Sequence, residues 1–206
     1  MAAEAITPAD VSRATELTLV RADATRAQVE RLCAAAIERG CHGVCVNSGR
    51  VADAYASGAD AGLKIVATVG FPFGAMDPDA KRYEAECAVD AGAHELDAVL
   101  NIGLLKDGAN SEVLRELRDI VEAADERPVK ILVDLSLLSE TEALTACQIV
   151  VDSGAQFISI SAEVERVRKI VEIVEPRFQV KAFASKMAEA TRLLEAGARR
   201  IGQVAT

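Results

Sequence analysis

Three charged residues interrupt apolar, strand-like runs of this sequence. Asp97 lies in HELDAVLN, Lys130 in VKILVDL and Lys181 in FQVKAF. Isolated charges are costly to bury, so an aspartate and two lysines that enter one core should pair with one another. A buried lysine beside a second cation has a lowered pKa and becomes a nucleophile toward carbonyl groups, while a carboxylate can move protons. We therefore take one of the two lysines as a candidate amine, the other as the cation that lowers its pKa, and Asp97 as the acid or base. The competing interpretation is that some of these side chains face surrounding helices or cap strand ends.

Polar side chains of smaller size occupy other predicted strands. Ser159 and Ser161 lie two residues apart in FISIS and so project to the same side of a strand. With Thr18, they are candidates for hydrogen bonds to substrate or water. Cys45 in GVCVN also belongs to the candidate substrate-binding residues, although a small buried hydrophobic role is expected for it because no histidine stands ready to activate a thiol. The remaining lysines are assigned to strand starts or to helix and loop surfaces: Lys64, Lys81, Lys106 and Lys169.

Short β-branched runs alternate with longer amphipathic segments along the whole chain. Strands are predicted near residues 15–20, 42–47, 64–70, 94–101, 129–135, 156–161, 178–183 and 199–203. Helices are predicted near residues 25–39, 49–60, 77–91, 111–124, 139–152, 163–174 and 186–196. Glycines end several helices just before the next strand, as expected for a left-handed helix cap.

Strict alternation of apolar strands with helices indicates a parallel sheet. Eight strands favour a closed (β/α)8 TIM barrel. We expect residues 1–206 to form this barrel as a single domain. The barrel is shortened at the C-terminus, because no helix is predicted after the last strand. A doubly wound open sheet is the alternative, but no Gly-rich phosphate turn follows the first strand. In such a barrel, chemistry is expected at the C-terminal ends of the strands.

Composition excludes several classes of protein. A formal net charge of −9 argues against a nucleic-acid partner, and no apolar run approaches the roughly 20 residues of a membrane span. The acidic N-terminus, broken by Pro8, does not resemble a signal peptide. Five cysteines without CxxC spacing indicate reduced thiols and a cytoplasmic protein. The two histidines give no basis for a histidine-based metal site.

Several motifs, in order and at compatible spacing over residues 13–202, resemble the deoxyribose-phosphate aldolase family of class I aldolases. They are GVCVN, KIVATVGFPFGA, DAKRYEAECAVDAGAHELDAVLNIG, VKILVDLSLL and QVKAFAS…LLEAGARRIG. The resemblance implies reversible aldol addition through a Schiff base on a sixth-strand lysine, a seventh-strand lysine that lowers its pKa, and a fourth-strand aspartate that relays protons. It aligns the aspartate with Asp97, the fifth-strand lysine with Lys130 and the seventh-strand lysine with Lys181. The family's first-strand DHTLL corresponds to ELTLV, which places Glu16 at the aspartate position and keeps Thr18.

The chain also departs from the family pattern. Ser159 stands at the position of the Schiff-base lysine, in FISISAEV instead of FVKTSTGF. The Gly-rich loop after that strand is shorter, KASGGIRT is replaced by KAFASKMA without the paired glycines, and GTSS or GASS after the eighth strand is replaced by GQVAT. Bare backbone N–H groups of Gly-rich turns bind phosphate, so their loss predicts that the usual phosphorylated substrate is not held in the usual way.

Two classes of function follow. The first is a divergent enzyme that acts on a small carbonyl substrate. One version forms a Schiff base on Lys181, with Lys130 as the cation that lowers its pKa and Asp97 as the acid or base. The other version uses Asp97 and Lys181 for acid/base lyase, cyclase or isomerase chemistry, and neither version needs a cofactor. Glu16 is counted with the substrate-binding residues. The second is an inactive family member that binds or regulates a partner, or a degraded paralogue that keeps only the fold. Uncovered surface beside the last strand predicts a homodimer.

Overall fold

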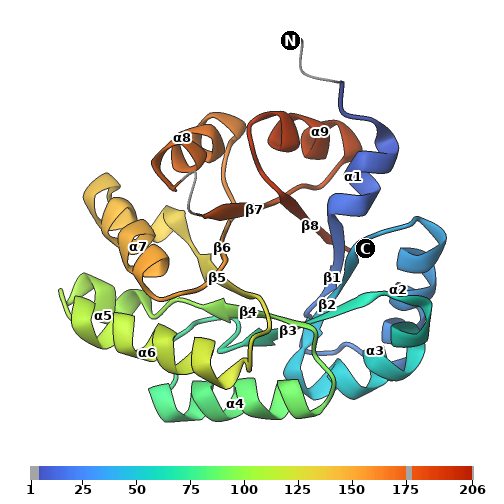
Figure 1. Ribbon diagram of the computed structural model, residues 1–206, viewed down its shortest axis with the longest axis horizontal. Helices are drawn as coiled ribbons and strands as arrows, with labels where there is room; N and C mark the ends of the chain where they lie inside the picture. The colour runs from blue at the N-terminus through green and yellow to red at the C-terminus, as the bar shows by residue number, and fades with distance from the viewer. Residues whose placement is uncertain (1–4, 175–177, 206) are drawn as a thin grey trace.

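The computed structural model describes residues 5–174 and 178–205, and these form a closed barrel of parallel strands (Figure 1). The strands pair in chain order, and β1 closes the barrel by pairing with β8. Their bounds are β1 Thr15–Leu19, β2 Gly43–Asn47, β3 Lys64–Val69, β4 Glu95–Val99, β5 Val129–Val133, β6 Phe157–Ile160, β7 Gln179–Phe183 and β8 Arg200–Val204. The predicted (β/α)8 barrel is confirmed, and each predicted strand is present.

Helices surround the barrel and cover the outer faces of the strands (Figure 1). They are α1 Pro8–Ala14, α2 Arg26–Glu38, α3 Val51–Gly58, α4 Pro78–Asp90, α5 Ile102–Lys106, α6 Asn110–Ala123, α7 Glu140–Asp152, α8 Val164–Val174 and α9 Met187–Glu195. Side chains cap several of their first turns: Thr25 accepts from the Gln28 N–H, and Ser139 accepts from the Glu142 N–H. All seven predicted helices are present. Within residues 5–174 and 178–205 no helix follows β8.

The N-terminal helix α1 was not predicted from the sequence. Pro8, interpreted as a break, is instead the first residue of this helix, where its missing N–H has no intrahelical partner to lose. Thr7 and Asp10 form a capping box around it. The helix packs against α9 and β8 and so adds cover beside the last strand.

The two faces of each strand have different chemistry. Outward side chains such as Ile65, Ala98, Ile131 and Ile158 are fully buried against the helices and form the main hydrophobic core. Inward positions carry polar and charged residues on β1, β4, β5, β7 and β8. The apolar layer between barrel and helices therefore supports the fold, and the interior holds the charged groups. No helix in the described parts of the chain is long and apolar enough to span a bilayer.

Candidate active site

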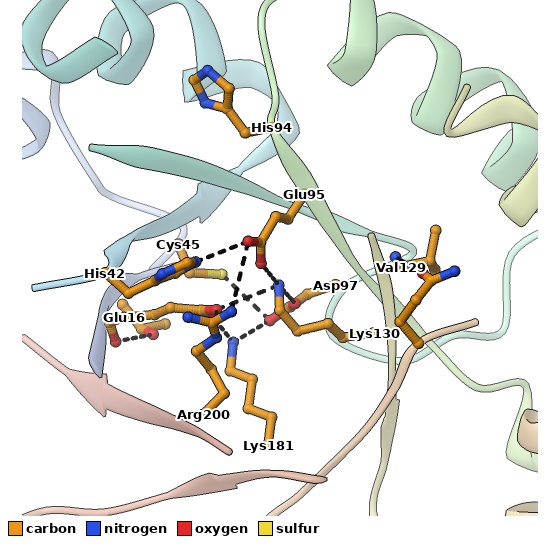
Figure 2. Close-up of polar contacts among 12 residues, drawn as sticks. Glu16, His42, Cys45, His94, Glu95, Asp97, Val129, Lys130, Lys181 and Arg200 are labelled. Atoms are coloured by element: carbon orange, nitrogen blue, oxygen red, sulfur yellow. Dashed lines mark hydrogen bonds and ion pairs between the residues drawn. The ribbon is translucent and has the colours of Figure 1, made fainter. Parts of the chain in front are cut away.

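Six charged side chains converge inside the barrel (Figure 2). Each lies on an inward position of its strand, and residues two apart on β4 supply two of them because successive side chains alternate between faces. At most 14% of any of these side chains is exposed. The three acids are Glu16, Glu95 and Asp97, and the three bases are Lys130, Lys181 and Arg200. We call these residues the barrel cluster.

Asp97 bridges the two lysines at the centre of the barrel cluster. Its Oδ2 accepts a hydrogen bond from Lys181 Nζ at 2.5 Å, and its Oδ1 accepts one from Lys130 Nζ at 3.0 Å. Burial alone would raise the pKa of Asp97, but the two ammonium groups lower it. The predicted pairing of these three residues inside one core is therefore confirmed.

Lys181 has a second carboxylate partner, Glu16, whose Oε2 accepts a hydrogen bond from Nζ. Burial would lower the pKa of Lys181, but the negative charges of Asp97 and Glu16 raise it above the ordinary lysine value. The sequence interpretation expected a lowered pKa; it is wrong because two carboxylates, and not one, contact the amine. Both contacts favour the protonated form of Lys181.

Lys130 likewise contacts more carboxylates than predicted. Its Nζ lies 2.7 Å from Glu95 Oε2 and 3.4 Å from Glu16 Oε1, in addition to Asp97. Burial opposes the charged form, but Asp97, Glu16 and Glu95 together raise the pKa of Lys130. Its charge is therefore compensated locally and does not depress the pKa of Lys181 below normal.

Two members of the barrel cluster, Glu95 and Arg200, lie toward its N-terminal side and were not predicted from the sequence. Nor was His42, which contacts Glu95. Arg200 Nε lies 3.3 Å from Glu16 Oε1, and His42 Nε2 lies 2.8 Å from Glu95 Oε1. Burial raises the pKa of Glu95, but the hydrogen bond to His42 and the charge of Lys130 lower it overall. One signal was available: Glu95 lies two residues before Asp97 and so shares its side of the strand.

Glu16, His42 and Glu95 also offer three potential metal ligands within 4.8 Å of one another. The carboxylates of this trio are already in ion-pair contact with Lys130 and Arg200. Fixed positive charges at that point would repel a metal cation. The arrangement fits an internal ion-pair network and not a metal centre.

Ser159 lies beside Lys181, because the two are register partners on β6 and β7. Its side chain is fully buried, and its Oγ has no hydrogen-bond partner among the described residues. An unpartnered buried hydroxyl is costly, which makes it a candidate contact for a bound molecule. Ser161 follows the end of β6 and is exposed, so the two serines of FISIS have different surroundings.

The other candidate substrate-binding residues are inside the barrel but already engaged. Cys45 Sγ donates to Asp97 Oδ2 at 3.7 Å, and burial together with the Asp97 charge raises the pKa of the thiol, so it is not a thiolate. Thr18 Oγ1 donates weakly to the Glu16 carbonyl at 3.4 Å. Glu16 itself contacts Lys130, Lys181 and Arg200 and has no exposed surface.

Lys81 was placed on a helix surface by the sequence interpretation, and this is wrong. The side chain is fully buried outside the barrel, between α4 and α6. Its Nζ donates to the carbonyls of Gly74 at 2.9 Å and Val99 at 2.7 Å and to Glu116 Oε1 at 2.5 Å. Lys81 therefore joins the loop after β3 to the end of β4, the strand that carries Asp97.

A sequence model of the DeoC/LacD family of aldolases matches residues 7–165. The chain belongs to this aldolase family. It is 35% identical to the deoxyribose-phosphate aldolase of Alkaliphilus oremlandii, over 96% of this chain and 93% of the relative, and 40% identical to that of Exiguobacterium sibiricum, over 90% and 88%. A solved structure described as QR15, an aldolase, superposes with a TM-score of 0.90 at 30% identity, covering 94% of this chain and 91% of the other.

Membership of this family of lyases confirms the predicted resemblance and the assignment of the protein to an enzyme family. The chain is thus an aldolase-family TIM barrel in which Lys181 on β7 lies between two carboxylates and Ser159 lies next to it.

Proposed function

We propose that this aldolase-family protein cleaves or forms a carbon–carbon bond in a small β-hydroxy carbonyl compound, and that this compound differs from deoxyribose 5-phosphate. Lys181 and Asp97 are the reacting groups, and Lys130 holds the second oxygen of Asp97. The observation that carries the proposal is the contact of the Lys181 ammonium with Asp97 beside the unpartnered hydroxyl of Ser159. A carbonyl oxygen placed there would meet two hydrogen-bond donors, and the substrate hydroxyl would meet a carboxylate.

The proposed cleavage needs no covalent intermediate. Asp97 takes the proton of the β-hydroxyl group, the bond between the α and β carbons breaks, and its electron pair forms an enolate. The Lys181 ammonium and the Ser159 hydroxyl stabilise the enolate oxygen, as preorganised donors do in other enzymes. The proton on Asp97 then returns to the α carbon, so two carbonyl compounds leave and the enzyme is unchanged.

This acid/base version is favoured over a Schiff base on Lys181. Attack on a carbonyl requires the neutral amine. Contact with Asp97 and Glu16 raises the pKa of Lys181 and so opposes loss of its proton. The same contacts favour a donor that stays charged throughout the reaction.

The decisive experiment pairs turnover with covalent trapping. A panel of β-hydroxy aldehydes and ketones is assayed for released aldehyde, and the protein is then treated with borohydride and analysed by mass spectrometry. We expect cleavage by the wild type without an adduct, and a loss of roughly 100-fold or more in D97N and K181M. K106M, which removes an exposed lysine of α5, is the matched control.

Each alternative gives a different result in this experiment. An adduct on Lys181 would establish the Schiff-base version and overturn the acid/base version. Absence of turnover with every carbonyl compound would overturn the proposed enzyme activity and favour the binding or regulatory alternative.

We also propose that two copies of the chain associate beside β8. A groove of about 510 Å³ lies between α2, β1 and β8, and Val204 next to it is 61% exposed. Light scattering should give the mass of a dimer, and a monomer would contradict this.

The five cysteines are free thiols, which supports the proposal of a reducing compartment such as the cytoplasm.

A further inference from the structure

The last residue of β7, Phe183, lies directly above the amine of the site. Inward positions alternate along the strand, so Phe183 follows Lys181 on the same side, toward the C-terminal mouth of the barrel. Lys181 Nζ lies 5.5 Å from the centroid of the Phe183 ring, within the range of a cation–π contact. The ring is half-buried, so one part of it faces the cluster and another part faces solvent.

Gly202 on the adjacent strand makes room for this ring. The two residues are register partners on β7 and β8. A Cβ atom at position 202 would lie 2.5 Å from both Cδ1 and Cε1 of Phe183, a distance that side chains do not tolerate. The absence of a side chain at Gly202 is therefore what allows the ring to lie across this side of the barrel mouth.

The turn after Phe183 is already occupied by a carboxylate. Ser185 donates to Glu189 Oε2 through its backbone N–H at 2.8 Å and through its hydroxyl at 3.0 Å. A free backbone N–H at such a turn attracts anionic ligands. Here an acid of the chain itself takes that hydrogen bond, and its negative charge repels a second anion.

We propose that Phe183 is a specificity-determining residue that restricts the site to uncharged carbonyl substrates. This inference rests on the proposed function and adds the substrate class to it. The negative face of an aromatic ring disfavours a phosphate or carboxylate beside it, and the ring offers no hydrogen bond to an anion. The carboxylate of Glu189 adds repulsion at the adjacent turn. A short, neutral hydroxy aldehyde or hydroxy ketone meets neither penalty.

The first test is a selectivity ratio with a matched pair of substrates, deoxyribose and deoxyribose 5-phosphate. We expect the wild type to have the higher kcat/KM for the uncharged sugar. The double variant F183A/E189Q should shift the ratio toward the phosphorylated sugar by about 10-fold, through KM more than through kcat. Y83A/E195Q is the control, since Tyr83 is an exposed aromatic of α4 and Glu195 an exposed acid of α9. An unchanged ratio, or a wild type that prefers the phosphorylated sugar, would overturn the inference.

A second readout does not depend on turnover. The protein is labelled with 4-fluorophenylalanine, and the fluorine resonance of position 183 is assigned by its disappearance in F183L. Titration with deoxyribose should shift that resonance saturably, and deoxyribose 5-phosphate at the same concentrations should not. A saturable shift with deoxyribose, together with no turnover of any compound in the carbonyl panel, would refute the proposed enzyme activity and leave the inference on Phe183 standing. Equal shifts with both sugars would overturn that inference whatever the activity.

Discussion

Ser159 and Lys181 are register partners on neighbouring strands, and of the two only Lys181 has a polar partner among the described residues. The position next to the ammonium is thus filled by a small, buried hydroxyl. The family resemblance places the reactive lysine there, which makes the effect of restoring it predictable.

S159K should create a reactive amine in this barrel. A fourth cation would enter a cluster whose three carboxylates are already matched, so burial and the Lys181 ammonium would both lower its pKa. We expect borohydride and acetaldehyde to trap an adduct at position 159, detected by peptide mass spectrometry. S161K, two residues further on in an exposed position, should remain unmodified under the same conditions. A folded S159K protein that forms no adduct would contradict this view of the site.

The stability contributed by the barrel cluster should depend on pH at both extremes. Lys130 and Lys181 have pKa values above the ordinary 10.5, so their contribution is complete below that value and is lost as pH rises through the folded pKa. Glu95 and Asp97 have pKa values below the ordinary 4.5 and 3.8. Their contribution to stability is therefore complete above those ordinary values and is lost as pH falls through the folded pKa.

Urea denaturation of wild type and K130M over a pH series measures this contribution. The difference in unfolding free energy should be about 3 kcal/mol or more between roughly pH 5 and pH 10, and should shrink outside that window. The conservative K130R keeps the charge and should recover part of the loss. A difference that does not change with pH would mean that packing, not charge, sets the effect.

Lys81 and Glu116 provide a test of a buried ion pair outside the barrel. Removing one member leaves the other charged and unpaired, so K81M should lower the unfolding free energy by about 3–5 kcal/mol. The double variant K81M/E116L removes both charges and should be less destabilised than either single variant. Thermal or urea denaturation of the four proteins gives the coupling energy, and additive losses would show that the contact is not important for stability.

The effect of a substitution at Gly202 on stability should depend on the ring of Phe183. G202A places a methyl group against the ring, so it should displace Phe183 and lower stability by about 1–3 kcal/mol. Removing the ring in F183A/G202A should relieve that overlap, so the cost of G202A should be much smaller in the F183A background. Urea denaturation of the four proteins measures this, and an equal cost in both backgrounds would show that the ring does not occupy the space above Gly202.

Periodicity was enough to predict the barrel because each strand and each main helix has its own local pattern. The helix α1 was not predicted because a proline can end one helix or begin another, and only the Thr7 and Asp10 cap decides between the two. Lys81 illustrates a different limit. A lysine in an amphipathic helix usually lies on the surface, and its partner Glu116 is 35 residues away in the sequence.

Only some members of the candidate site were predictable from the sequence, and its electrostatics were not. A charge in an apolar strand identified Asp97, Lys130 and Lys181. The direction of the lysine pKa depended on Glu16 and Glu95, which lie near strand starts and do not interrupt an apolar run. Side chains from five strands meet inside the barrel, and this arrangement determines which charges compensate one another.

The contacts of Glu16 with Lys181 and Arg200 join the first strand to the last two. A barrel that has assembled only its first four strands would hold Glu16, Glu95 and Asp97 without any of their three basic partners. Such an intermediate would expose three carboxylates to one another in a narrow interior, and its free energy would be high. The arrangement therefore favours folding in which the two ends of the chain meet early or all strands close together, and it disfavours stable half-barrels.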